Sequence, residues 1–354
     1  MTNHTGRTES GELSVDALLD RGYQVKALFS PEHGIFGVEQ DGVKTGDGEY
    51  GKIPSFSLYG ENRRPSGEQL DGLEMILFDM QEIGSRFYTY LYTLAYVMEE
   101  AAKKGIAVVV TDRPAPLGRK IEGNPIASEF DSFVGAYGLP CRTGMTIGEY
   151  ALYLKEHYIP GCELEVVETE RETALGWKDY RWINPSPNIP TMNSALIYGG
   201  TCLVEGTVLS EGRGTTRPFE QIGAPWIDGR ILAGELNSIG LEGVCFTSSR
   251  FKPEFSKHKG EVCGGIQVHC TDGNVLSPLK TGVAILGTIA SLYPEQTLVR
   301  ERSTGEKHSF MDKLTGTGDF ALQLEKRTGW KNLYGLISGG EETFEKKRFS
   351  SLLY

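Results

Sequence analysis

The sequence predicts an α/β protein with a Rossmann-like, parallel-sheet N-terminal domain and a second, smaller α+β C-terminal domain. In the first half, nearly continuous apolar segments alternate with helix-period segments, which is typical of a parallel sheet covered on both faces. Beyond about residue 205, Gly-rich loops and alternating strand-like segments replace this pattern. A chain of 354 residues also exceeds the usual length of one domain. We therefore expect domains over residues 1–205 and 206–354, with a cleft between them.

The first elements are a short helix and a strand. Ser14 is placed to cap the helix and Gly22 to end it. The segment VKALFS (25–30) follows as an apolar run, and LEMILFDM (73–80) is a second run of the same kind. Both runs predict buried strands.

The next elements complete the α/β pattern. Apolar residues recur at spacings of four and three over residues 87–104, which predicts one face of a helix. The segment IAVVVTDRP (106–114) predicts a third buried strand. Thr146 and Glu149 form a capping-box pattern at the start of a further helix.

The C-terminal elements have a different texture. The segment GGIQVHCT (264–271) alternates as a strand does, and Pro278 is placed in the first turn of a long apolar helix. The tail (338–354) predicts a final helix with a solvated charged face.

Composition excludes several classes of function. The net charge is −11 and no long basic run occurs, which argues against a nucleic-acid partner. No apolar run approaches the ~18 residues that a membrane-spanning helix needs. The six cysteines contain no C-x-x-C pair, so we expect free structural thiols and neither a metal nor a redox site.

Ionisable residues follow each predicted strand of the N-terminal domain. An open parallel sheet usually binds its ligand beyond the carboxyl ends of its strands. The candidates at these ends are Glu32 and His33 after the first strand, Asp79, Gln81, Glu82 and Arg86 after the second, and Asp112 and Arg113 after the third. We expect these side chains to converge on one rim.

The usual cofactor and nucleophile motifs are absent from the sequence. No G-x-G-x-x-G follows a strand, and neither a Walker phosphate loop nor a G-x-S-x-G nucleophile elbow occurs. The sequence therefore predicts no cofactor, and the candidate chemistry rests on carboxylates, arginines and tyrosines.

Glu32 is the leading candidate for an acid. It lies in PEHG, where a proline and a glycine force a turn, and partial burial at a strand end can raise the pKa of a carboxylic acid. The alternative is a carboxylate that caps the turn or pairs with an arginine. His33 is a candidate ligand contact or a hydrogen-bonded turn residue.

The segment DMQEIGSRFYTYLYTL (79–94) offers a second carboxylate and a cation. Arg86, entering a helix, can bind a carboxylate bidentately, and Tyr88 follows in the same turn. The alternatives are an internal ion pair that fixes the loop, and half-buried packing for the tyrosine.

Two loops in the second half add polar candidates. The segment SEGRGTTRPFEQIGAPW (210–226) lacks apolar periodicity and mixes hydrogen-bonding side chains with an aromatic, as sugar sites do. It can instead be a salt-bridged interdomain loop. The candidate ligand-binding residues are Glu211, Arg213, Thr215 and Arg217 in this loop and Asn188 in the proline-rich NPSPNIPT (184–191).

Together, these segments resemble one family, the NamZ-type exo-β-N-acetylmuramidases. The resemblance rests on TNHTG, ALFSPEHGIFG, DMQEIGSRFYTY, TDRPAPLG, EGNP, GLPCRTGMTIGEYA, PSPNIPT and EGTVLSEGRGTTRPFEQIGAPW, in this order over nearly the whole chain. It implies a Rossmann-like domain, a smaller C-terminal domain, and an active site in the cleft between them. It also implies release of N-acetylmuramic acid from non-reducing ends of peptidoglycan fragments, with Glu32 as the catalytic residue.

The sequence departs from this family in two places. Glu82 stands where the family usually has Asp, and the chain begins at TNHTG, where relatives carry a preceding strand. We expect either a missing sheet strand or a start assigned too late. The opening residues lack a signal peptide, which predicts a cytoplasmic protein if the chain is complete and an extracytoplasmic one if its start is truncated.

The resulting hypothesis is a glycosidase. Glu32 protonates the leaving oxygen, while Glu82, or as the second choice Glu211, activates water or attacks the anomeric carbon. The lactyl carboxylate of the sugar needs a cation, for which Arg86, Arg113, Arg213 and Arg217 are candidates. A non-catalytic muropeptide-binding protein is the main alternative, and a phosphosugar enzyme that binds its anion at helix N-termini is a third.

Overall fold

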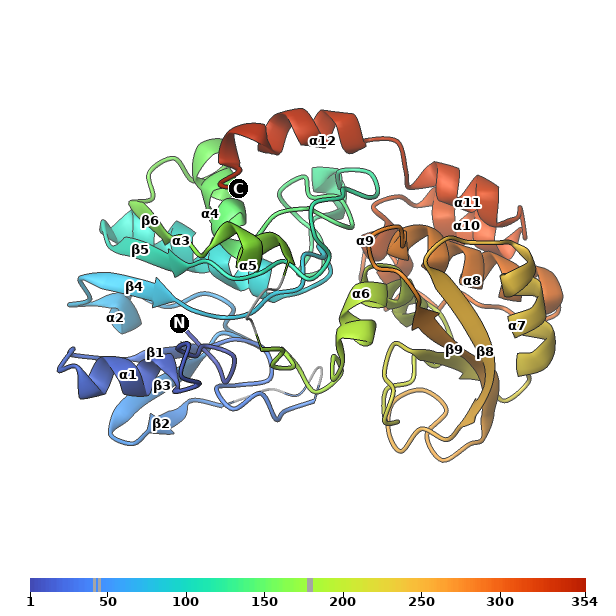
Figure 1. The fold of residues 1–354 in the computed structure, drawn as a ribbon, viewed down its shortest axis with the longest axis horizontal. Coiled ribbons are helices and arrows are strands. Elements are labelled where there is room, and N and C mark those ends of the chain that lie inside the picture. The colour runs from blue at the N-terminus through green and yellow to red at the C-terminus, as the bar shows by residue number, and fades with distance from the viewer. Residues whose placement is uncertain (41–42, 44–45, 177–180) are drawn as a thin grey trace.

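The computed structural model describes residues 1–40, 43, 46–176 and 181–354, and it has two lobes (Figure 1). The N-terminal lobe contains two three-stranded sheets. In one, β1 (Leu28–Ser30) lies parallel to β3 (Ile53–Ser57), which pairs antiparallel with β2 (Gly48–Tyr50). In the other, β4 (Met75–Phe78), β5 (Ala107–Thr111) and β6 (Leu164–Val167) are all parallel. The predicted parallel α/β architecture is confirmed.

The first two residues lie between these sheets. The Met1 amino group donates to the Leu77 carbonyl at 2.8 Å, and the Asp79 amide donates to the Met1 carbonyl at 3.1 Å. On the other side, the Thr2 amide donates to the Phe29 carbonyl at 3.1 Å. Met1 and Thr2 therefore occupy the end of a strand position between β1 and β4.

The first strand is shorter than predicted, and the first helix begins differently. Parallel pairing with β3 starts at Leu28, so β1 covers only half of the segment 25–30. Helix α1 (Ser14–Asp20) has Leu13 at its N-cap, and the Ser14 hydroxyl donates to Asp79 instead of capping the helix. The capping prediction for Ser14 is therefore wrong, because a distant carboxylate takes its hydrogen bond.

The remaining helices of this lobe follow the sequence pattern. α3 (Tyr90–Lys104) ends at Gly105 in the left-handed conformation, and α4 (Ile147–His157) begins with the predicted capping box. Both helices pack against β5. The shorter elements are α2 (Gly67–Leu70), α5 (Arg171–Gly176) and the 3₁₀ helix η1 (Ser128–Phe130).

The C-terminal lobe is an antiparallel sheet with helices against it. The strand order is β7-β9-β8, and the bounds are Gln221–Ala224 for β7, Val244–Phe251 for β8 and Cys263–Cys270 for β9. Its helices are α6 (Met192–Thr201), α7 (Gly229–Ser238), α8 (Pro278–Leu292), α9 (Phe310–Thr315), α10 (Asp319–Glu325) and α11 (Trp330–Leu336), with the 3₁₀ helix η2 (Cys202–Gly206) after α6. The predicted strand at 264–271 and the predicted helix that starts at Pro278 are confirmed.

Helices α6 and α8 cross very closely. A Cβ atom on Gly200 would lie 1.7 Å from the Pro278 carbonyl oxygen, and one on Gly282 would lie 2.1 Å from the Gly200 carbonyl oxygen. Only glycine fits at these two positions, because even a methyl group would overlap backbone atoms.

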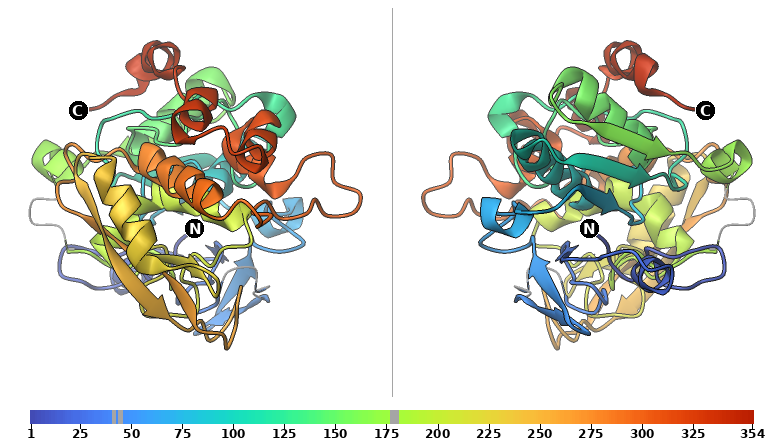
Figure 2. Two further views of the ribbon diagram at one scale, coloured as in Figure 1. Left: turned by 90° about the vertical axis from the view of Figure 1, so that its right-hand side faces the viewer. Right: turned by 90° about the vertical axis from the view of Figure 1, so that its left-hand side faces the viewer.

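The chain ends by returning to the N-terminal lobe. α12 (Glu341–Arg348) and the 3₁₀ helix η3 (Phe349–Ser351) pass over the top of the molecule, and Figure 2 shows this red segment above the N-terminal lobe in both side views. Arg348 Nη1 donates to the Thr143 carbonyl at 3.0 Å, and the Tyr354 hydroxyl donates to Asp112 Oδ2 at 2.9 Å. The tail therefore helps to hold the two lobes together.

Three further observations concern the described part of the chain. All six cysteines are free thiols, as the sequence predicts. No helix among the described residues is long and apolar enough to cross a membrane. Within the same residues, no group of three or more His, Cys, Asp or Glu side chains is placed to hold a metal ion.

Candidate active site

A cavity of about 880 Å³ receives side chains from both lobes. The N-terminal lobe contributes residues that follow β1 and β3 and residues at the start of α3, while the C-terminal lobe contributes α6, η2 and the loop before β7. The polar residues that line the cavity include Glu32, His33, Tyr88, Thr89, Glu205, Glu211, Arg213 and Lys257.

Glu32 is a buried carboxylate in the wall of this cavity. Its side chain follows β1 and is only 5% exposed. Oε2 accepts a hydrogen bond from the Thr89 hydroxyl at 2.8 Å. Among the described residues Oε1 has no hydrogen-bond partner, although the atom is buried. A buried carboxyl oxygen is costly to leave unpaired, and Glu32 lines the cavity, so a ligand bound there is the candidate for the missing contact.

The turn that carries Glu32 has an unusual backbone. His33 has a φ of 73° and Gly34 a φ of 74°, so two successive residues adopt the left-handed conformation. His33 Nδ1 lies 2.7 Å from the Glu39 carbonyl oxygen. A carbonyl can only accept, so Nδ1 carries the ring proton. This hydrogen bond stabilises the turn, and His33 also lines the cavity.

A hydrogen-bonded chain supports the same turn from behind. Asn3 Nδ2 donates to the Tyr90 hydroxyl at 3.0 Å, and that hydroxyl donates to the Pro185 carbonyl at 2.8 Å. The Tyr90 hydroxyl also lies 3.5 Å from the Glu32 carbonyl oxygen. Burial holds the pKa of Tyr90 well above its usual value, so it stays a donor. TNHTG therefore acts as a support for the PEHG turn.

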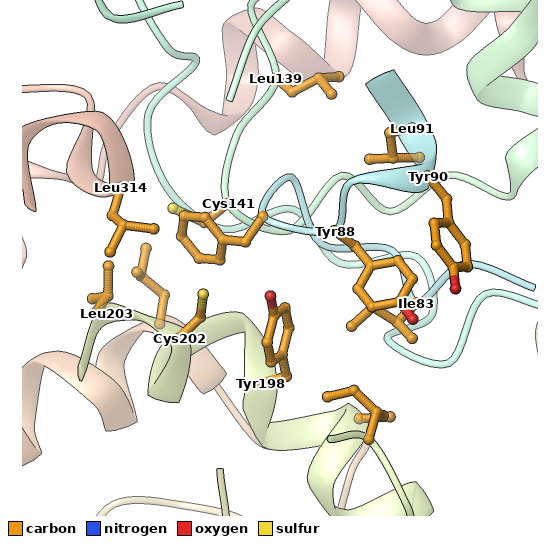
Figure 3. Close-up of a cluster of buried hydrophobic side chains, with 14 of the residues drawn as sticks. Ile83, Tyr88, Tyr90, Leu91, Leu139, Cys141, Tyr198, Cys202, Leu203 and Leu314 are labelled. Atoms are coloured by element: carbon orange, nitrogen blue, oxygen red, sulfur yellow. The ribbon is translucent and has the colours of Figure 1, made fainter. Parts of the chain in front are cut away.

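A row of aromatic rings connects the two lobes along the cavity. The Tyr88 ring contacts Tyr90 at 4.7 Å and Tyr198 at 6.2 Å between centroids, and Tyr198 contacts Phe219 at 4.7 Å, all edge to face. Figure 3 shows Tyr88 from the N-terminal lobe beside Tyr198 of α6, close to Cys202. Aromatic rings at a cavity wall offer apolar surface to the faces of a sugar.

The carboxylates of the C-terminal lobe are surrounded by cations. Glu211 lies 2.7 Å from Lys257 Nζ and 3.4 Å from Arg213 Nε, and Arg213 Nη2 lies 2.5 Å from Glu205. Lys257 also donates to the Val204 carbonyl at 3.0 Å. Burial lowers the pKa of Lys257, and the nearby Glu211 opposes that lowering. On one wall of the cavity, Glu32 thus forms no ion pair with any residue that the structure describes, and on the other wall Glu211 contacts two cations.

The structure brings half of the sequence-predicted site residues to this cavity. Those in its lining are Glu32, His33, Tyr88, Asn188, Glu211 and Arg213, whereas Glu82, Arg86, Asp112, Arg113, Thr215 and Arg217 lie outside it. Of the candidates at the three strand ends, only Glu32 and His33 after the first strand line the cavity, so the predicted rim is not the wall of one cavity.

Glu82 and Arg86 are engaged inside the protein. One Glu82 oxygen accepts from the Gly84 amide, and burial raises the pKa of Glu82 to about 8. Arg86 donates to the carbonyls of Asn124 at 3.0 Å, Leu139 at 3.1 Å and Leu314 at 2.6 Å. Arg86 therefore fixes backbone segments of both lobes and has little capacity left to grip a substrate.

Asp112 and Arg113 are engaged in the same way. Asp112 accepts from the Thr146 hydroxyl and from the Gly148 amide, both at 2.7 Å, so it holds the start of α4. Arg113 Nε donates to Asp79 at 2.7 Å. The internal ion pair that the sequence left open for the segment 79–94 is found at Asp79, but its partner is Arg113 and not Arg86.

Thr215 and Arg217, in the loop before β7, bind groups of the same loop, whereas Asn188 of the segment 184–191 reaches the cavity. The Thr215 hydroxyl donates to the Gly212 carbonyl at 2.7 Å, and Arg217 pairs with Glu220 at 3.4 Å, so both stabilise the loop itself. Asn188 lines the cavity while its amide donates to Gln40 Oε1 at 3.2 Å.

Sequence reasoning missed several polar residues of the cavity, among them Thr89, Glu205, Lys257 and Arg63. Thr89 and Glu205 lie within the segments DMQEIGSRFYTY and EGTVLSEGRGTTRPFEQIGAPW, but their spacing alone does not single them out, and Arg63 follows β3. Pro54 within that strand obscured its pattern, although the alternation around Phe56 was a signal that could have revealed it.

Comparison with known proteins gives matches over the whole chain. The family model described as "Exo-beta-N-acetylmuramidase NamZ, N-terminal" matches residues 1–193, and its C-terminal counterpart matches residues 196–354. A curated relative, the peptidoglycan beta-N-acetylmuramidase NamZ of Bacillus subtilis (strain 168), is 41% identical over 361 residues, with 100% of this chain and 86% of the relative covered.

Two crystal structures of DUF1343 family proteins from Bacteroides fragilis NCTC 9343 share the fold. One superposes with a TM-score of 0.90 at 30% identity, and the other with 0.75 at 27% identity. Each comparison covers 100% of this chain and 92% of the other.

Proposed function

The chain belongs to the NamZ family of exo-β-N-acetylmuramidases, and on this premise we propose that it hydrolyses the β-glycosidic bond of a terminal N-acetylmuramic acid in peptidoglycan fragments. The observation that carries the proposal is Glu32. It is a buried carboxyl group in the wall of a sugar-sized cavity, and its Oε1 has no partner among the described residues.

Glu32 serves as the general acid. In its protonated form, the carboxyl group donates its proton to the glycosidic oxygen as the bond from that oxygen to the anomeric carbon breaks. Thr89 fixes Oε2, which leaves Oε1 for the substrate. Among the described residues, no cation forms an ion pair with Glu32, whereas Glu211 contacts two cations.

Glu211 serves as the second carboxylate in place of Glu82. Glu211 lines the cavity from the opposite lobe and contacts two cations, whereas Glu82 lies outside the cavity. An ionised Glu211 either attacks the anomeric carbon or takes a proton from the attacking water, and hydrolysis then adds that water across the bond. Carboxyl groups roughly 5 Å apart give retention and those roughly 6.5–9.5 Å apart give inversion, so the anomer first released identifies the pathway.

The test measures release of 4-nitrophenol from the 4-nitrophenyl β-glycoside of N-acetylmuramic acid. We expect Glu32→Gln to lower kcat by about 10²–10⁴-fold, because the amide cannot supply the proton. Glu82→Gln is the matched control, since it makes the same chemical change at a buried carboxyl group outside the cavity. It should leave kcat within about threefold.

Two outcomes contradict the proposal. A near-normal rate for Glu32→Gln removes Glu32 from its role. A wild-type protein that binds the MurNAc–GlcNAc disaccharide and returns it intact is a binding protein instead of a glycosidase.

A further inference from the structure

The four arginines that the sequence favours for the lactyl carboxylate all have partners within the protein. Arg86 donates to three carbonyl oxygens, Arg113 pairs with Asp79, Arg213 pairs with Glu205 and Glu211, and Arg217 pairs with Glu220. A substrate carboxylate would have to compete with each of these contacts. The cation for the substrate is therefore to be found elsewhere in the cavity.

Arg63 is a cavity-lining arginine without such a neutralising contact. Its guanidinium lies over the Phe133 ring at 4.2 Å from the centroid, and both residues line the cavity. Among the described residues, no carboxylate forms an ion pair with Arg63. Arg63 thus presents a full positive charge to this space.

The ring beneath Arg63 is itself held in place. Phe133 packs against Tyr59 at 6.1 Å and against both Tyr92 and Tyr96 at 6.0 Å between centroids. A guanidinium stacked on a fixed ring has one face covered while its N–H donors point outward in the plane. This geometry suits bidentate binding of a carboxylate.

The fold places Arg63 and Glu32 at the same edge of the sheet. Arg63 follows β3 and Glu32 follows β1, and these two strands are parallel. Loops after neighbouring parallel strands meet at one edge. The proposed acid and the unneutralised arginine therefore reach the cavity from adjacent strand ends.

We propose that Arg63 binds the carboxylate of the lactyl ether, the group that distinguishes N-acetylmuramic acid from N-acetylglucosamine, and so sets the specificity of the enzyme. This inference rests on the proposed function. It makes Arg63 a substrate-binding residue with no part in proton transfer.

The neighbouring Arg64 is a matched control. Its guanidinium also lies over a ring, Tyr96, at 4.0 Å, but it pairs with Glu99 and with Glu100 at 3.2 Å, and it does not line the cavity. Arg300 is a second control, because it lines the cavity from the C-terminal lobe and donates to the Glu205 carbonyl at 3.5 Å.

The experiment is a binding cycle that needs no turnover. In the Glu32→Gln background, calorimetry measures the affinity for N-acetylmuramic acid and for its lactyl methyl ester, which keeps the sugar and removes the negative charge. With Arg63 intact, we expect the acid to bind about 10–100-fold more tightly than the ester, as for a charge-assisted hydrogen bond. With Arg63→Ala the two affinities should become equal, and with Arg64→Ala the preference should be kept.

Kinetics provide the second measurement. In the otherwise wild-type enzyme, Arg63→Ala should raise KM for the N-acetylmuramic acid glycoside by about 10–100-fold with a small change in kcat, and Arg63→Lys should restore part of the loss. An unchanged preference for the acid in Arg63→Ala overturns the inference, as does its loss in Arg300→Ala alone. A wild-type enzyme that releases no sugar overturns the proposed function, while the binding cycle still decides the role of Arg63.

Discussion

Glu32 and Glu82 stand at the ends of two strands of the same lobe, and both are buried carboxyl groups with one oxygen that has no hydrogen-bond partner in the described part of the chain. Glu32 lines the cavity, whereas Glu82 is enclosed by the protein and accepts a hydrogen bond from the Gly84 amide. A ligand in the cavity can supply the missing contact to Glu32, while the unpaired oxygen of Glu82 is a cost to the folded state. An acidic residue at a strand end therefore indicates a site only when a cavity adjoins it.

The comparison predicts its largest effect on stability at Arg86, which is buried and lies outside the cavity, as Glu82 does. Arg86→Met removes the side-chain donor to the carbonyls of Asn124, Leu139 and Leu314, of which Leu139 keeps the Ile126 amide as a donor, and it breaks a link between the lobes. We expect a loss of about 3 kcal/mol or more in the free energy of unfolding, measured by urea denaturation.

Arg217→Met is the control for this substitution. Arg217 is 48% exposed and forms one ion pair, so its loss should change stability by no more than about 0.5 kcal/mol. If Arg86→Met keeps its stability but no longer binds N-acetylmuramic acid, Arg86 binds substrate and its structural role is wrong.

The next prediction concerns the pH dependence of stability at Glu82. Burial raises its folded pKa from 4.5 to about 8, so between these values the folded state keeps a proton that the unfolded state has released. The stabilisation is complete below pH 4.5 and is lost as pH rises through about 8, by a few kcal/mol at most. Glu82→Gln should flatten this fall and be more stable than the wild type at pH 8.

Urea denaturation at intervals across this pH window measures the effect. Matching slopes for the two proteins would show that Glu82 does not hold the proton.

The smallest effect is expected at Thr89. This residue occupies the N-cap position of α3, yet its hydroxyl makes no capping bond and donates to Glu32 instead. Thr89→Val removes that donor at nearly constant volume, so we expect kcat to fall about 5–10-fold.

Thr93→Val is the matched control on the same helix. Its hydroxyl donates to the Thr89 carbonyl at 3.2 Å and does not touch Glu32. Equal losses of activity in the two variants would assign both effects to the helix and none to the positioning of the acid.

Much of the fold could be predicted because its signals are local. The Thr146–Glu149 capping box, the helix end at Gly105 and the start of α8 at Pro278 each depend on neighbours within one turn. The PEHG turn is of the same kind, and its Glu32, which the sequence singles out, lines the cavity.

The sequence by itself determined the α/β fold class, several main elements and the acidic turn, whereas tertiary structure decided which other charges face the cavity. Arg86 and Leu314 meet across 228 positions, and Glu211 and Lys257 come together from separate loops. Each charged residue binds whatever group the distant chain brings to it, and that partner cannot be read from its neighbours. For this reason the sequence alone could not show that Arg86 is hydrogen-bonded inside the protein. It also could not show that Arg63 stacks on Phe133 at the cavity, where we propose that it binds the substrate.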